Sequence, residues 1–225
     1  MEIGFLTTVF PSLDEAIEVA LDLEIGSLEL AHDDVERVRA AGLRVAALAR
    51  YRDWTNLEPH IRLAADEGID AVSTLAGFPE HRDGLRELLE PAVELAGRLG
   101  VHLAFENWYR TNLRTLDDWR WFLTMFPQKH VGLVFDPSHL EWQRIDWRAA
   151  LDEFRSRIVF VHAKDVAYDT DGAWRYVVPG RGVIDWGDLD YDGFVSIEHE
   201  DKERSPRGGV VAAVEHLRSR LSAGA

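Results

Sequence analysis

Three carboxylates and one imidazole follow one another in the second half of the chain, each at or near the end of an apolar, β-like run. They are Glu106 in HLAFENW, Asp136 in VGLVFDPSH, His162 in RIVFVHAKD and Glu198 in GFVSIEHED. The gaps between them are 30, 26 and 36 residues, about the length of one strand–helix unit. If these units are consecutive strands of a closed parallel barrel, the four side chains meet at one rim, where such barrels carry their active sites.

The types of these four side chains predict a metal site. Three oxygen ligands and one nitrogen, with no sulfur, suit one divalent cation, Mn²⁺ first and Mg²⁺ or Co²⁺ as alternatives. Four protein ligands leave two positions of an octahedron open for water or for two adjacent oxygens of a substrate. A small sugar or hydroxy-carbonyl compound fits that arrangement. The chain has no cysteine, which excludes thiolate ligands, disulfides and a cysteine nucleophile.

Other polar residues lie close in sequence to the candidate ligands. His139 follows Asp136 by three residues in a proline-containing turn, and could bind a substrate oxygen, support a ligand or take a second metal. Lys164 has the side-chain parity of His162, so it could point into the same pocket and stabilise an oxyanion. Asp165 has the opposite parity and could instead order the loop that follows.

Predicted loops and strand ends offer further substrate contacts. Arg181 lies in the turn-rich segment PGRGVIDW and could clamp a carboxylate or phosphate, or remain solvated. Trp108, like Trp142 and Trp174, could stack on a sugar face or pack in the core. Glu29 ends an early apolar run on the same rim, and could line the pocket or only cap the next helix.

The elements that must position these residues are apolar runs alternating with amphipathic helical stretches. The eight predicted strands span residues 3–8, 27–30, 44–50, 71–77, 102–108, 131–136, 157–165 and 194–200. Most are continuously apolar, which is typical of strands buried on both faces. Helix starts are predicted at residues with capping chemistry or just before a helical pattern: Ser12, Asp33, Glu80–His81, Thr115 and Asp146.

Eight strand–helix units predict one (β/α)8 TIM barrel domain spanning residues 1–225. A doubly wound sheet is the competing fold, but no glycine-rich phosphate loop follows the first run. The barrel should be compact, because VIDWGDLDYDG leaves hardly one turn of helix between the last two strands.

Composition narrows the expected partners. The formal net charge is −15, with 40 acidic and 25 basic residues, so we expect no nucleic-acid partner. No apolar segment approaches the roughly 18 residues that span a bilayer, and the amino terminus lacks the pattern of a secretory signal. We therefore expect a cytoplasmic protein without a membrane partner, which could form a homo-oligomer.

Several motifs together resemble the sugar phosphate isomerase/epimerase family, the xylose-isomerase-like barrels. They are FEN, FDPSH, VHAKD, PGRGVIDW and YDGFVSIEHED, which begin at residues 105, 135, 161, 179 and 191. The resemblance implies a (β/α)8 barrel with a divalent metal held by the four residues named first. It also implies that Glu106 and Glu198 exchange the substrate proton, as in ketose epimerases, and that His139 contacts substrate. Ketose epimerases of this family tend to carry arginine where this chain has Tyr168.

The resulting hypothesis is a metal-dependent isomerase or epimerase that works through an enediolate. One of Glu106 and Glu198 would remove a carbon-bound proton, and the other would return a proton. A lyase of the inosose dehydratase type is the alternative, with His139 or Lys164 as the acid that releases a β-hydroxyl. A non-catalytic sugar-binding or structural barrel is the third possibility.

Overall fold

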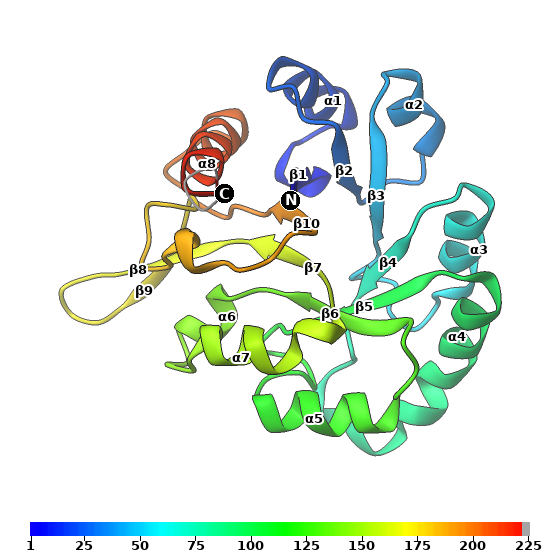
Figure 1. Cartoon of the computed structure of the whole chain (residues 1–225). Helices are drawn as coiled ribbons and strands as arrows, with labels where there is room; N and C mark the ends of the chain where they lie inside the picture. Colours follow the sequence, from blue (N-terminus) through cyan, green and yellow to red (C-terminus); the bar gives the residue numbers. More distant parts are fainter. Residues whose placement is uncertain (222–225) are drawn as a thin grey trace.

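Eight parallel strands close into a barrel in the computed structural model, which describes residues 1–221 (Figure 1). Seven follow in chain order from β1 to β7, and β10 lies between β7 and β1. The strands are β1 (Glu2–Leu6), β2 (Ser27–Leu30), β3 (Arg44–Ala49), β4 (Ala71–Thr74), β5 (His102–Glu106), β6 (Val131–Phe135), β7 (Ile158–Ala163) and β10 (Phe194–Ile197). Each overlaps one of the eight predicted strands, so the predicted barrel is confirmed. The last four residues of the predicted 1–225 domain lie outside the described residues.

Helices surround the barrel in the connections between strands (Figure 1). The α-helices are α1 (Leu13–Asp22), α2 (Val35–Ala40), α3 (Glu58–Asp66), α4 (Leu85–Leu99), α5 (Leu116–Met125), α6 (Ser138–Glu141), α7 (Trp147–Phe154) and α8 (Pro206–Leu221). Short 3-10 turns are η1 (Thr7–Val9), η2 (Pro79–Gly84), η3 (Arg155–Arg157) and η4 (Trp186–Asp188). The stretch between β7 and β10, all of it described, carries only η4 as helix, as predicted. No helix within residues 1–221 has both the length and the hydropathy needed to cross a membrane.

Side-chain caps begin three helices where they were predicted, at Ser12, Thr115 and Asp146. Two predicted starts were wrong. Asp34 caps α2 in place of Asp33, whose carboxylate instead forms an ion pair with Arg50 (2.7 Å). The predicted start at Glu80–His81 lies within η2, and α4 begins only at Leu85.

Apolar side chains fill the barrel interior below the rim. The buried interior cluster, with Phe194 packed against it, is Ala47, Ala71, Ala104, Val134 and Phe160. The Phe160 and Phe194 rings lie 5.8 Å apart. Gly4 makes room for the Phe194 ring, because a Cβ there would overlap that ring and a backbone carbonyl of β2. Three interior residues stand two positions before Glu106, Asp136 or His162, so the pleat that turns them inward also turns the polar residues inward.

A hairpin that was not predicted follows β7. Its strands β8 (Asp165–Tyr168) and β9 (Trp174–Val177) pair antiparallel and extend away from the barrel (Figure 1). The predicted seventh strand, residues 157–165, was therefore too long, since β7 ends at Ala163. The signal that could have found the hairpin is the Asp-Gly pair between two β-like runs, with Gly172 at φ 85°.

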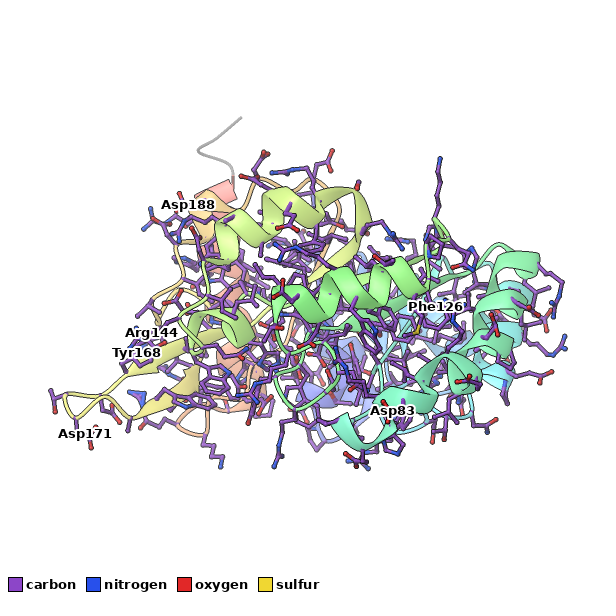
Figure 2. The ribbon with its side chains drawn as sticks, turned by 90° about the horizontal axis from the view of Figure 1, so that it is seen from below. Asp83, Phe126, Arg144, Tyr168, Asp171 and Asp188 are labelled. Carbon is purple, nitrogen blue, oxygen red and sulfur yellow. The ribbon has the colours of Figure 1, made fainter. Side chains whose placement is uncertain are left out.

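Tyr168, at the turn end of β8, fastens this hairpin to the connection after β6. Its hydroxyl donates to the Glu141 carbonyl (3.0 Å), and the Arg144 guanidinium lies 4.1 Å from its ring centroid. Figure 2 shows Arg144 and Tyr168 next to each other and Asp171 at the hairpin tip. The residue at the position where ketose epimerases tend to carry arginine thus has a structural contact here.

Candidate metal centre

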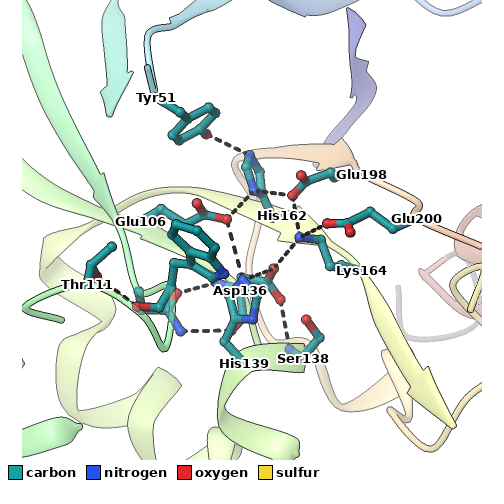
Figure 3. A network of polar contacts seen from close by, with 12 residues as sticks. Tyr51, Glu106, Thr111, Asp136, Ser138, His139, His162, Lys164, Glu198 and Glu200 are labelled. Atoms are coloured by element: carbon teal, nitrogen blue, oxygen red, sulfur yellow. Dashed lines mark hydrogen bonds and ion pairs between the residues drawn. The ribbon is translucent and has the colours of Figure 1, made fainter. Parts of the chain in front are cut away.

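Glu106, Asp136, His162 and Glu198 come together at the carboxyl-terminal mouth of the barrel (Figure 3). One donor atom from each lies within 4.8 Å of all the others. The side chains of Asp136 and His162 are fully buried, and those of Glu106 and Glu198 are 9% and 19% exposed. The strand order explains the convergence, because all four residues occupy the inward parity at the ends of β5, β6, β7 and β10.

His162 lies at the middle of the group. Its Nδ1 is 3.1 Å from Glu198 Oε2 and 3.3 Å from Glu106 Oε1. Glu198 follows β10, next to β7, whereas Glu106 ends β5, two strands away on the other side. The two carboxylates therefore reach the same ring nitrogen from strands on either side of β7.

The donor set fits a divalent cation. Asp136 Oδ1 accepts the Ser138 backbone N–H (2.8 Å), while its Oδ2 is buried and accepts no hydrogen bond among the described residues. Buried acceptors of that kind are costly unless another partner satisfies them. An ion bound at about 2.1 Å from each donor places opposite donors roughly 4.2 Å apart, so small side-chain adjustments suffice.

Burial and charge act against each other on the ionisable groups of the site. Burial raises the pKa of Glu198, but the Lys164 ammonium and His162 lower it to about 2. Burial likewise opposes ionisation of Glu106, yet contacts with His139 and His162 hold its pKa well below the usual range. For His162 and Lys164, burial lowers the pKa, and the surrounding carboxylates raise it well above the ordinary value. At neutral pH both carboxylates are therefore ionised.

The far side of the His162 ring meets Glu29, which is fully buried on β2. The distance from His162 Nε2 to Glu29 Oε2 is 2.9 Å, and the Tyr51 hydroxyl lies 3.2 Å from the same nitrogen. Glu29 thus points into the barrel behind His162; it neither caps the next helix, which Asp34 does, nor lines the cavity, so neither of its two sequence interpretations was right. Sequence reasoning missed Tyr51, although its parity relative to the inward residue Ala47 on β3 was a usable signal.

A cavity of about 350 Å³ opens above the four residues. Its lining consists of charged, aromatic and apolar side chains: Tyr51, Leu75, Glu106, Trp108, Tyr109, Arg110, His139, Lys164, Tyr176, Glu198 and Glu200. The predicted substrate contacts His139, Lys164 and Trp108 are therefore at the cavity. Trp142 and Trp174 instead stack on each other outside that lining, with ring centroids 5.2 Å apart.

Lys164 is buried beside the carboxylates. Its Nζ lies 2.9 Å from Glu198 Oε2, 3.0 Å from Glu200 Oε1 and 3.6 Å from Asp136 Oδ2. Glu200 was missed in the sequence, although it stands two residues after Glu198 with the same parity. Lys164 is thus positioned to neutralise negative charge at the cavity floor.

The hairpin contributes one wall of the cavity. Tyr176 of β9 places its hydroxyl 3.2 Å from His139 Nδ1, and its ring centroid lies 5.0 Å from Lys164 Nζ. The opposite ring nitrogen of His139 lies 3.4 Å from Asp136 Oδ2. Because the hairpin was not predicted, Tyr176 could not be predicted as a site residue either.

Arg181 does not lie at this cavity. Its side chain is exposed and lines a separate hollow with Pro179, His216 and neighbouring residues of α8. Arg181 is held away from the cavity because the backbone of its loop is hydrogen-bonded to the buried carboxylate of Asp165. That carboxylate accepts five hydrogen bonds, from the N–H groups of Val166, Gly180, Gly182 and Ile184 and from Trp186 Nε1. The alternative interpretation of Asp165 as a loop-ordering residue is the one that the structure shows.

Asp165→Ala should lower the free energy of unfolding by about 3–5 kcal/mol, because several buried donors would lose their acceptor. Urea denaturation followed by tryptophan fluorescence measures this change. Asp171→Ala is the control, since Asp171 also accepts a backbone N–H, from Ala173 (3.1 Å), but is exposed in the hairpin turn. Equal, small losses for both variants would contradict the structural role of Asp165.

Comparison with known proteins finds one matching family and several relatives of this chain. The family described as xylose isomerase-like TIM barrel matches residues 35–220. The chain is 34% identical to YfiH of Bacillus subtilis (strain 168) over 119 residues, which cover 41% of this chain and 38% of YfiH. It is 26% identical to the inosose dehydratase of Bacillus velezensis over 142 residues, 54% of this chain and 48% of the dehydratase. The matches thus span less than half the length of both relatives.

Solved structures share the fold over nearly the whole chain. The probable 3-DHS dehydratase AsbF of Bacillus anthracis has a TM-score of 0.78 at 16% identity, covering 97% of this chain and 99% of its own. The 3-keto-D-glucoside 4-epimerase YcjR of E. coli has a TM-score of 0.76 at 21% identity, covering 99% of both chains. A crystal structure of the IolI protein with a bound zinc atom has a TM-score of 0.78 at 17% identity, covering 99% of this chain and 98% of its own.

Proposed function

Because the chain belongs to the xylose isomerase-like TIM barrel family, we propose that it is a divalent-metal-dependent isomerase or epimerase of a small sugar or hydroxy-carbonyl compound. The observation that supports this most is the convergence of four donor atoms within 4.8 Å beneath a cavity of about 350 Å³. Cavities of roughly 300–1,000 Å³ are the usual size for small-molecule sites. The epimerase YcjR, which shares the fold, is consistent with this class of substrate.

Glu106, Asp136, His162 and Glu198 are the proposed ligands of one ion. Mn²⁺ is the first choice and Mg²⁺ or Co²⁺ the alternatives, because oxygen-rich donor sets with one imidazole suit these cations. A bound divalent cation polarises a carbonyl group and acidifies the neighbouring C–H bond.

Glu106 and Glu198 are the proposed proton carriers. Both are ionised at neutral pH, and they come from strands on either side of β7. One takes the carbon-bound proton and leaves an enediolate, and the other returns a proton to the opposite face or to the adjacent carbon. Return to the opposite face gives an epimer, and return to the adjacent carbon gives an isomer.

Neighbouring side chains would bind and orient the substrate. Lys164 stays charged because the carboxylates raise its pKa, and it would stabilise the negative oxygen of the enediolate. His139 would hydrogen-bond a substrate oxygen, while Trp108 would cover a sugar face.

Deuterium uptake from solvent tests this proposal. The Mn²⁺-loaded protein is incubated in D₂O with a panel of ketoses and keto-inositols, and the proton spectrum of each is followed by NMR. We expect one compound to lose a carbon-bound proton signal and to form an isomer, and we expect EDTA-treated protein to do neither. Retention of Mn²⁺ with no deuterium uptake by any compound would favour a non-catalytic sugar-binding barrel.

A lyase remains the second candidate, and two observations favour it. Lys164 and His139 both line the cavity beside the proposed bases, and five curated relatives are inosose dehydratases at 24–27% identity. In this reaction the electron pair left by proton removal forms a C=C bond and expels a β-hydroxyl, which leaves as water with a proton from His139 or Lys164. Mass spectrometry separates the two reactions, since a lyase product is lighter by one water and an isomer has unchanged mass.

A further inference from the structure

Glu29 is a buried carboxylate that lies outside the group of four converging donors but touches one of them. Its Oε2 is 2.9 Å from His162 Nε2, whereas the other ring nitrogen, Nδ1, faces Glu106 and Glu198. Glu29 and the candidate metal position are therefore on opposite sides of the same imidazole ring. Figure 3 shows the ring between Tyr51 on one side and the two carboxylates on the other.

Both oxygens of Glu29 are held by hydroxyl groups from other strands. Ser196 Oγ donates to Oε2 (2.7 Å), while Ser73 Oγ (2.7 Å) and Tyr51 Oη (2.9 Å) donate to Oε1. With His162, the contacts to Glu29 come from β10, β4, β7 and the residues just after β3. Glu29 is thus fixed in place and cannot turn toward the four donors without losing these bonds.

A carboxylate at this position needs an explanation. The interior layer immediately below is apolar, and burying an ionised group costs several kcal/mol unless it is well paired. The hydroxyl groups of Ser196, Ser73 and Tyr51 are neutral partners for this carboxylate, whereas His162 is its only titratable cationic partner among the described residues. The orientation of that ring matters, because an imidazole can bind a cation through either nitrogen.

We infer that Glu29 is the positioning residue of this centre. It accepts the His162 Nε2–H and thereby directs Nδ1 toward the space shared with Glu106 and Glu198. The inference rests on the proposed function in one respect, since Nδ1 is taken as the atom that binds the ion. Outer carboxylate partners of metal-bound histidines typically contribute 10–100-fold to metal affinity.

Metal titration of Glu29→Gln tests the inference. We expect the Kd for Mn²⁺, measured by electron paramagnetic resonance, to rise 10–100-fold. We also expect the visible spectrum of the Co²⁺-loaded protein to change, because the histidine ligand would be less firmly held. Ser196→Ala removes one hydrogen bond to Glu29 Oε2 and should also raise the Kd for Mn²⁺. This variant provides the test if Glu29→Gln folds poorly.

Thr74→Val is the matched control. Thr74 is a buried hydroxyl residue on β4 beside Ser73, and it donates to the Arg50 carbonyl (3.0 Å) instead of to Glu29. It should lower the melting temperature without changing the Kd for Mn²⁺. Wild-type affinity in both Glu29→Gln and Ser196→Ala would overturn the inference.

A second measurement needs no metal. In the metal-free protein, nitrogen-15 NMR should detect a hydrogen-bonded Nε2–H of His162, assigned by its loss in His162→Gln, and this signal should shift or vanish in Glu29→Gln. Absence of that signal from the wild-type protein would overturn the inference. Failure of the wild-type protein to bind Mn²⁺, with the signal present, would instead overturn the proposed metal-dependent function and leave the orientation of the ring established.

Discussion

Glu198→Gln should lower the rate of carbon–proton exchange by about 10³-fold, within the range that a general base typically contributes. The amide cannot accept the substrate proton, whereas the Glu198 carboxylate, whose pKa Lys164 and His162 lower to about 2, is ionised at neutral pH. The rate is measured as deuterium uptake from D₂O at saturating Mn²⁺. Because Glu198 is also a proposed ligand, metal content is determined in the same samples, so that the loss of proton transfer is separated from the loss of the ion.

Glu203→Gln provides the matched control for this experiment. Glu203 is exposed and lies five residues after Glu198, in the loop before α8, where its removal should leave exchange unchanged. A Glu198→Gln protein that holds its metal and exchanges at the wild-type rate would show that Glu198 does not carry the proton.

Asp136→Asn should raise the Kd for Mn²⁺ by at least about 100-fold. Asp136 Oδ1 accepts the Ser138 N–H, so an asparagine would keep its oxygen there and turn its amide NH₂, a donor, toward the ion. Thermal unfolding with and without Mn²⁺ measures the effect. At 100 times the Kd, the ion should stabilise the wild-type protein by about 2.7 kcal/mol, and the same concentration should scarcely stabilise the variant.

His139→Ala is the informative comparison for Asp136→Asn. His139 lies 3.4 Å from Asp136 Oδ2 but is proposed to contact substrate, so its loss should raise KM or lower kcat while metal content stays near normal. Equal loss of Mn²⁺ from both variants would instead make His139 a ligand. Unchanged Mn²⁺ binding in Asp136→Asn would remove Asp136 from the ligand set.

The sequence allowed the barrel and the four converging residues to be predicted, because strand period and strand ends determine which side chains turn inward at the rim. The position of Lys164 at the cavity was predicted by the same parity argument. The prediction that Arg181 contacts substrate was not supported, because the path of its loop depends on hydrogen bonds from the loop backbone to the buried Asp165 carboxylate. The periodicity of the sequence does not reveal such bonds. The contact between Tyr176 and His139 also depends on the path of the hairpin and could not be foreseen from strand ends. Glu29 was considered a candidate, but its contact with His162, 133 residues away, depends on how β2 and β7 face each other across the barrel.

The Phe160 and Phe194 rings determine how a small molecule can enter and leave the barrel. With the small alanines around them they plug the barrel beneath the polar layer, so a solute that enters between the rim loops has no exit at the other end. Product must therefore leave through the same mouth of the barrel before the next substrate enters. Selectivity for new substrates can consequently evolve by changes in rim segments such as the hairpin. The apolar layer around Phe160 and Phe194 and the charged residues above it need not change.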